Sequence, residues 1–78
     1  MKSTGKDERE FVQSLARGLA VIRAFDEDHA TMTLSEVASR VDMTRATARR
    51  LLLTLVALGY ADLVGKRFSL KPTVLDLG

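Results

Sequence analysis

Three arginines stand in a stretch of the chain that has no acidic residue. Arg45, Arg49 and Arg50 lie between Asp42 and Asp62, and no Asp or Glu separates those two residues. A guanidinium group presents a charged, planar fork of donors that matches phosphate oxygens and the edge of a guanine base. Most charge runs are solvated helix faces, but such faces usually mix Glu with Lys. The arginine stretch therefore favours contact with a polyanion.

The charge of the whole chain is unevenly distributed. Residues 1–43 carry six basic and eight acidic side chains, whereas residues 44–78 carry six basic and two acidic ones. The formal net charge of +2 is too small by itself to indicate a nucleic-acid partner. The positive potential is concentrated in the carboxyl-terminal part, where the arginines lie.

Catalysis and metal binding have few candidate residues. The chain has one histidine, His29, and no cysteine. It has no Gly-rich phosphate loop, and neither a nucleophile–histidine–acid group nor a metal site can be assembled around His29. We therefore expect no enzyme activity, no cofactor and no metal, and we interpret His29 as a surface residue. The lack of cysteine, of a signal peptide and of an apolar run near the ~20 residues that span a bilayer predicts a cytoplasmic protein.

The arginines are expected on a helix over about residues 45–58. Thr44 is a suitable N-cap because its hydroxyl can accept a hydrogen bond from a free amide, and Gly59 suits the position after the last turn. Helical periodicity then separates an apolar side from a polar side. The inward side comprises Ala48, Leu51, Leu52, Leu55 and Leu58, and the outward side comprises Ala46, Arg49, Arg50 and Thr54.

A second, shorter helix precedes this one. Thr33 and Glu36 have the spacing of a capping box, so this helix begins at Leu34, and it ends near Val41. Asp42 then occupies the turn between the helices, where the backbone tends toward positive φ; Asp tolerates that conformation better than most residues. Two helices joined by a tight turn, the second with a basic outer face, form a helix-turn-helix unit.

Two further elements complete the predicted fold. A first helix begins after Ser14 as its N-cap, and its core stripe is Leu15, Leu19, Ile22 and Phe25. Residues 60–64 and 67–70 form a hairpin around Gly65 and Lys66, with the glycine at positive φ. The fold class is therefore mainly α with a small β-hairpin, a winged helix-turn-helix. Residues 1–10 are expected as a disordered tail, residues 11–72 as the domain and residues 73–78 as the start of a linker helix.

These elements predict sequence-specific binding to double-stranded DNA. The helix over 45–58 would enter the major groove, and the wing over 61–70 would meet the backbone or the minor groove. The alternative is a winged-helix module that binds another protein, because the fold alone does not dictate the partner. The predicted DNA contacts are Thr44, Arg45, Ala46 and Thr47 at base edges, Arg49 and Arg50 at bases or phosphates, Lys66 and Arg67 on the wing, and Arg17 on the first helix at a phosphate. Arg17 is equally well interpreted as a solvated side chain.

Three segments of the chain resemble a known family. They are VQSLARGLAVIRAF, LSEVASRVDMTRATARRLLLTLVALGY and RFSLKPTVLDLG, and they resemble the amino-terminal domain of IclR-type bacterial transcription regulators, in particular the branch that controls protocatechuate and 4-hydroxybenzoate catabolism. The resemblance implies a dimer or tetramer on a palindromic operator of aromatic-acid catabolism genes. It also implies a small-molecule effector bound by a separate carboxyl-terminal domain that these residues do not include. In such regulators the first helix helps to pair the DNA-binding domains, a role assigned here to Ala20, Val21 and Ala24.

Overall fold

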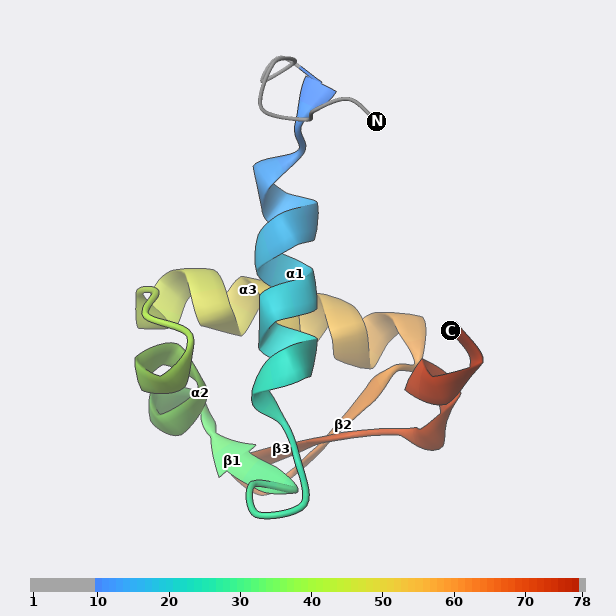
Figure 1. Cartoon of the computed structure of the whole chain (residues 1–78). Coiled ribbons are helices and arrows are strands. Elements are labelled where there is room, and N and C mark those ends of the chain that lie inside the picture. Colours follow the sequence, from blue (N-terminus) through green and yellow to red (C-terminus); the bar gives the residue numbers. More distant parts are fainter. Residues whose placement is uncertain (1–9, 78) are drawn as a thin grey trace.

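Over residues 10–77 the chain folds into three α-helices and a small antiparallel sheet (Figure 1). The computed structural model describes residues 10–77. α1 crosses α3, α2 packs beside α3, and the sheet lies beneath the helices (Figure 1). This arrangement confirms the predicted winged helix-turn-helix. In chain order the elements are α1 (Gln13–Ala24), β1 (Thr31–Thr33), α2 (Leu34–Arg40), α3 (Arg45–Leu58), β2 (Ala61–Val64), β3 (Arg67–Leu70) and the 3-10 helix η2 (Pro72–Leu77).

Short-range hydrogen bonds determine where α2 and α3 begin and where α3 ends. The Thr33 hydroxyl accepts from the Glu36 amide, and the Glu36 carboxylate accepts from the Thr33 amide, which completes the predicted capping box. The Thr44 hydroxyl accepts from the Thr47 amide at 3.1 Å. Gly59 closes α3 in the left-handed conformation with φ 88°. The predicted bounds of both helices are confirmed to within one residue.

The sheet has one strand more than the sequence indicated. β1 pairs antiparallel with β3, and β3 pairs with β2, so that the hairpin is extended by a third strand in the order β1-β3-β2. Met32 of β1 stands opposite Phe68 of β3, and both side chains are buried. A three-residue strand is too short to show the alternation by which strands are recognised. At the hairpin turn, Gly65 has the expected positive φ of 64°.

α1 packs against the rest of the domain through a different face from the one predicted. Val21 is fully buried and Ala24 nearly so, whereas Leu15 is 62% exposed and Leu19 46% exposed. The assignment of Leu15 and Leu19 to the core is therefore wrong, and so is the assignment of Val21 and Ala24 to a pairing surface. The helix is apolar on two faces, and periodicity identifies apolar positions without saying which of them docks. The smaller side chains face the core, where they allow closer helix approach.

Two smaller expectations are also wrong. α1 begins at Gln13 with Val12 as its N-cap, and no side chain caps it, so Ser14 lies within the first turn. Leu58, expected on the inner side of α3, is 64% exposed because it lies in the last turn, outside the core cluster. The buried cluster consists of Val21, Ala24, Met32, Val37, Ala38, Ala48, Leu52 and Phe68.

The structure covers the predicted amino-terminal tail and the predicted linker helix only in part. The expected tail over 1–10 falls almost wholly on residues 1–9, which lie outside the described residues. Near the other end, η2 is a 3-10 helix in whose first turn the Val74 amide donates to the Lys71 carbonyl at 3.0 Å. A linker helix over 73–78 stays a prediction. Over residues 10–77, none of the helices has the length and apolar character needed to cross a membrane.

Candidate nucleic-acid interface

The connection between α2 and α3 has the geometry of a helix-turn-helix turn. Asp42 adopts φ 55°, as predicted for the turn position, and is the one non-glycine residue with positive φ among the described residues. The Met43 amide donates to the Ala38 carbonyl at 3.0 Å, which closes the turn onto α2. Ala38 and Ala48 are both buried, and their small side chains let α2 and α3 cross closely.

The outer face of α3 presents the arginines to solvent. Arg45, Arg49 and Arg50 are exposed, as is Ala46 between them. No guanidinium of the three forms an ion pair or hydrogen bond with any other residue of the range 10–74. The helix behind them is continuous and held by buried Ala48 and Leu52. The surface is therefore cationic, free of internal partners and mounted on a rigid element.

The beginning of α3 lies beside α1. The Thr44 hydroxyl donates to the Thr47 hydroxyl at 3.0 Å while accepting from the Thr47 amide, so both side chains are oriented before any ligand binds. Gln13 and Arg17 of α1 line the same surface hollow as Thr44 and Thr47. Arg17 is exposed there. The tertiary structure thus brings Arg17 to the end of α3 that the sequence assigned to base reading.

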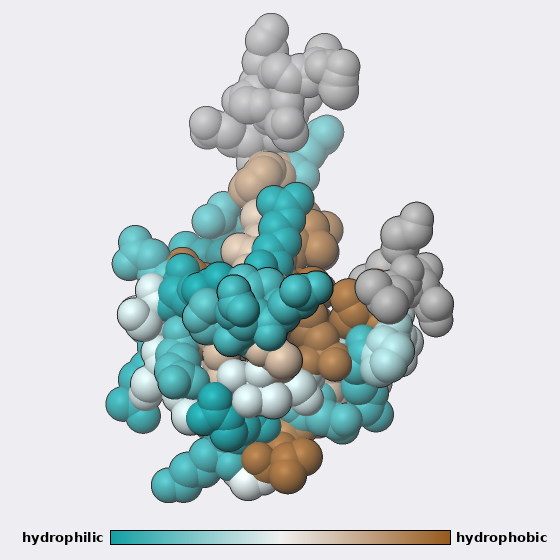
Figure 2. Space-filling view, turned by 60° about the horizontal axis from the view of Figure 1, so that its bottom comes forward, coloured by the Kyte–Doolittle hydropathy of each residue, from teal (hydrophilic) through white to brown (hydrophobic). Residues whose placement is uncertain are grey.

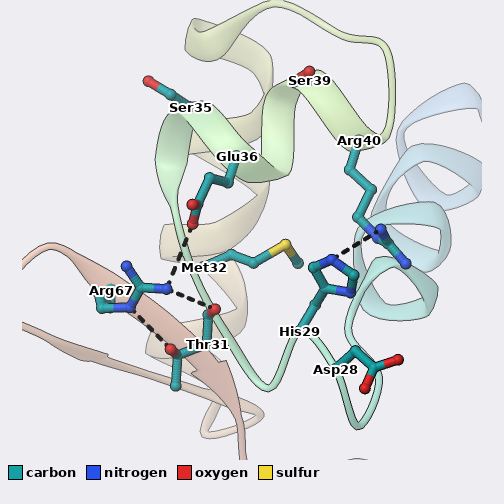
Figure 3. A pocket seen from close by; sticks show the side chains of 9 residues that line it. All are labelled: Asp28, His29, Thr31, Met32, Ser35, Glu36, Ser39, Arg40 and Arg67. Atoms are coloured by element: carbon teal, nitrogen blue, oxygen red, sulfur yellow. Dashed lines mark hydrogen bonds and ion pairs between the residues drawn. The ribbon is translucent and has the colours of Figure 1, made fainter.

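On the wing, Lys66 and Arg67 differ in their surroundings. Lys66 occupies the hairpin turn and is exposed. The Arg67 guanidinium instead turns toward α2 (Figure 3). Its Nε donates to the Thr31 hydroxyl at 2.9 Å, and its Nη2 donates to the Thr31 carbonyl at 3.0 Å and lies 3.5 Å from Glu36 Oε1. The two basic residues were expected to act alike, and the structure gives only one of them intramolecular partners.

A second polar network was not anticipated from the sequence. Arg40 donates through Nε to the Ala24 carbonyl at 2.8 Å and through Nη2 to Asp26 at 2.9 Å. Asp26 also lies 3.0 Å from His29 Nδ1, and this side-chain hydrogen bond is the main reason why the pKa of Asp26 is lowered. His29 is at the surface, as expected, but it belongs to this network between the end of α1 and the end of α2.

The remaining surface divides into a hydrophilic face and an apolar flank. Seen from the side of the sheet, the domain is mostly hydrophilic, with hydrophobic residues gathered at one flank and at the lower edge (Figure 2). Between α1 and α3, an apolar hollow of about 600 Å³ is lined by leucines, among them Leu15, Leu19, Leu55 and Leu58. No three His, Asp or Glu side chains of the described range lie close enough together to hold a metal ion.

These features define a winged helix-turn-helix domain, and comparisons with known proteins place it in a family. The sequence profile described as "IclR helix-turn-helix domain" matches residues 14–64. The chain is 49% identical over 69 residues to the Pca regulon regulatory protein of Pseudomonas putida. The aligned residues make up 88% of this chain and 24% of that protein. It is 39% identical over 66 residues to the p-hydroxybenzoate hydroxylase transcriptional activator of Acinetobacter baylyi, and the aligned residues make up 85% of this chain and 24% of that protein.

A solved structure agrees with the sequence matches. It is a candidate transcriptional regulator from Rhodococcus sp. RHA1, with a TM-score of 0.85 and 63% identity over 87% of this chain and 27% of that one. The chain belongs to the IclR helix-turn-helix domain family. It is therefore a DNA-binding domain of the transcription-regulator type and not an enzyme, and it spans about a quarter of the length of the curated relatives that it matches.

Proposed function

We propose that this domain binds double-stranded DNA sequence-specifically, with the first turns of α3 in the major groove. The observation that carries the proposal is the set of three exposed arginines on one continuous helix, none of which has an ion-pair or hydrogen-bond partner for its guanidinium in the range 10–74. Free guanidinium groups exchange their hydration and counterions for phosphate and guanine contacts without breaking internal bonds. The carboxylate-free interval on either side removes the acidic groups that would repel the DNA backbone.

Each predicted contact has a role in this arrangement. Thr44, Arg45, Ala46 and Thr47 stand at the beginning of α3 and face the base edges; the small Ala46 side chain lets the helix approach closely and fits beside a thymine methyl group. Arg49 and Arg50 reach bases or phosphates from the next turn. Arg17 holds a phosphate beside Thr44 and Thr47, whose surface hollow it shares. Lys66, next to Arg67, contacts the backbone or the minor groove at the wing.

In the complete protein, we infer that two copies of the domain bind a palindromic operator. Each α3 would enter a major groove about one helical turn from its mate. The exposed Leu15 and Leu19 on α1 are available for pairing, in place of the buried Val21 and Ala24. The names of the relatives support a role in controlling aromatic-acid catabolism genes. We also propose a cytoplasmic location and a small-molecule effector bound by a further domain, as the family resemblance implies.

A protein-binding function is the second candidate. The apolar hollow between α1 and α3 is a surface on which another polypeptide could pack, and its lining includes Arg50 but neither Arg45 nor Arg49. Replacing Arg45 and Arg49 with Ala, with Arg50 of the hollow left in place, separates the two functions. DNA binding would be lost, whereas a protein bound at the leucine-lined hollow would stay bound.

Selection of bound duplexes from a random pool, followed by titration at several salt concentrations, tests the leading proposal. Log affinity should fall with log salt at a slope of about −0.9 for each phosphate contacted. In the triple variant, with Arg45, Arg49 and Arg50 all replaced by Ala, the slope should be smaller in magnitude by up to about 2.7, which is about 0.9 for each of three lost phosphate contacts. The change is smaller if an arginine contacts a base instead of a phosphate. The fold of this variant should persist, because the three side chains are exposed and no hydrogen bond or ion pair of their guanidinium groups is found over residues 10–74.

Arg23→Ala is the matched control for charge. Arg23 is exposed in the last turn of α1 and lies near Arg40 rather than on the outer face of α3. The substitution Arg23→Ala removes one positive charge from the same domain. The DNA affinity of this variant should stay within about twofold of the parent, because one screened charge has only a weak long-range effect. Affinity that is indifferent to salt, or equal losses for Arg23→Ala and for single α3 variants, would contradict the proposal.

A further inference from the structure

The place of Arg67 in the sheet gives it access to two other elements. Arg67 is the first residue of β3, the central strand, and stands opposite Thr33 of β1 on one side and Val64 of β2 on the other. It directly follows Lys66 at the tip of the wing. Its side chain extends across β1 to Thr31 and then to Glu36 on α2 (Figure 3). One residue thus joins the end of the wing next to its turn to the helix-turn-helix unit.

The partners of Arg67 are themselves held in place. Glu36 Oε1 accepts from the Thr33 amide at 2.8 Å, and this backbone hydrogen bond is the main cause of its lowered pKa, to which the charge of Arg67 also contributes. The same carboxylate therefore caps α2 and pairs with the wing strand. Thr31 offers both its hydroxyl and its carbonyl, so the guanidinium donates two hydrogen bonds to one residue and also lies in an ion pair with Glu36. A lysine has no planar fork of donors and cannot reproduce that geometry.

Such a connection matters for binding because the wing and α3 must contact one duplex together. Lys66 lies in the two-residue turn at the end of the hairpin, directly before Arg67. A small rotation of this end of the hairpin displaces Lys66 relative to α3. The rotation is limited by the pairing of β1 with β3 and by the bonds of Arg67 to Thr31 and Glu36. The two hydrogen bonds to Thr31 hold the guanidinium against β1 and α2, and turning it from there toward a phosphate at the wing turn would break them.

We propose that Arg67 is a positioning residue, which orients the wing so that Lys66 reaches the DNA, and that Arg67 does not itself contact the nucleic acid. The proposal rests on the DNA-binding function proposed above. It gives different roles to Lys66 and Arg67, which the sequence analysis predicted to contact DNA alike. It predicts that the shape of the guanidinium fork, and not its charge, is what binding requires.

The conservative substitution Arg67→Lys tests this directly. A positioning role predicts that Arg67→Lys weakens binding to the selected duplex about three- to tenfold, nearly as much as Arg67→Ala, because neither variant restores the fork. A phosphate ligand would keep most of its affinity as lysine, because the charge is retained. The matched control is Arg23→Lys, at an exposed arginine for which no bond to another described residue is found, and it should leave affinity unchanged.

A double-mutant cycle shows whether Arg67 acts through Lys66. If it does, Arg67→Ala adds little loss once Lys66→Ala is present, and the double variant has the salt slope of Lys66→Ala alone. If Arg67 is an independent ligand, the two losses add and the slope falls by about 0.9 for each residue. Additive losses together with full affinity of Arg67→Lys would overturn the proposal.

Hydrogen exchange of the free domain gives a readout that needs no DNA. Thr31→Val keeps the strand residue branched but removes the hydroxyl acceptor, and with Arg67→Lys it should speed amide exchange in β3 and in the wing turn. Because the bonds are at the surface, the melting temperature should move by less than about 3 °C. Unchanged exchange in both variants overturns the positioning role. Faster exchange in a domain that fails to bind any duplex would instead refute the DNA-binding function, and would show only that Arg67 holds the wing against α2.

Discussion

Replacing Val21 with Ala should destabilise the domain more than replacing the larger Leu15 with Ala. Val21 is fully buried in the cluster shared by α1, α2 and α3, and Val21→Ala removes two carbon atoms, worth about 0.8 kcal/mol each in transfer free energy. The cavity left behind adds to this loss, and the better helix propensity of Ala returns roughly 0.5 kcal/mol. The expected loss in the free energy of unfolding is therefore about 2 kcal/mol.

For a domain of this size, that loss corresponds to a melting temperature lower by about 10 °C. Leu15→Ala should change stability by less than about 0.5 kcal/mol, because most of that side chain is already in water. Circular dichroism during heating, together with urea titration, measures both variants. The spacing of apolar residues alone predicts the opposite order, so the experiment distinguishes the pattern from the tertiary structure.

A dilution series is the necessary control, because a dimer formed over Leu15 would add stability that depends on concentration. In dilute, monomeric samples the Leu15→Ala loss should vanish, whereas the Val21→Ala loss should stay the same at every concentration. If Leu15→Ala costs as much as Val21→Ala in a monomeric sample, the orientation of α1 described above is wrong.

Three other substitutions test the local signals that begin and end the helices. Thr44→Ala removes the acceptor of the Thr47 amide and should cost about 1 kcal/mol in urea denaturation, and Thr44→Ser should restore most of it; an Ala variant as stable as the parent would contradict the capping role. Gly59→Ala should cost about 1 kcal/mol although nothing lies within 4 Å of the added Cβ, since φ 88° alone disfavours an L-residue, and thermal unfolding without a loss would show that the helix end had rearranged. The pKa of Glu36 is lowered by its hydrogen bond from the Thr33 amide, so its contribution to stability is present at neutral pH and is lost as the pH falls below its ordinary value of 4.5. Glu36→Gln, which keeps a capping side chain but does not titrate, should flatten the decline of the melting temperature over this acid range, and an equally steep decline would disprove the linkage.

Much of the helix-turn-helix unit was predictable because its signals are local. The capping box of Thr33 with Glu36, the N-cap of Thr44 and the left-handed Gly59 each involve partners within four residues along the chain. Asp42 at positive φ is likewise a property of one short turn. The exposed arginine face of α3 followed from these bounds, since a helix with known ends has a known distribution of side chains around its axis.

The predicted DNA contacts separate into those that follow from α3 and those that depend on neighbouring elements. The arginines of α3 needed only the helix. The position of Arg17 beside Thr44 and Thr47 required the crossing of α1 over α3, which no pattern in α1 encodes. The network of Arg40 with Asp26 and His29 was missed for the same reason, because Arg40 and the Ala24 carbonyl are 16 positions apart in sequence.

The sequence by itself determined the ends of α2 and α3, the hairpin turn and the cationic face, because hydrogen bonds to the nearest amides satisfy the backbone there. Only the tertiary structure decided that α1 buries Val21 and exposes Leu15, that residues 31–33 form a strand, and that Arg67 bonds to Thr31, 36 positions away. Packing of a helix with two apolar faces depends on the shape of its neighbours, and pairing of distant polar groups depends on strand register. The shape of the neighbouring elements and the strand register are both determined only when the elements pack together.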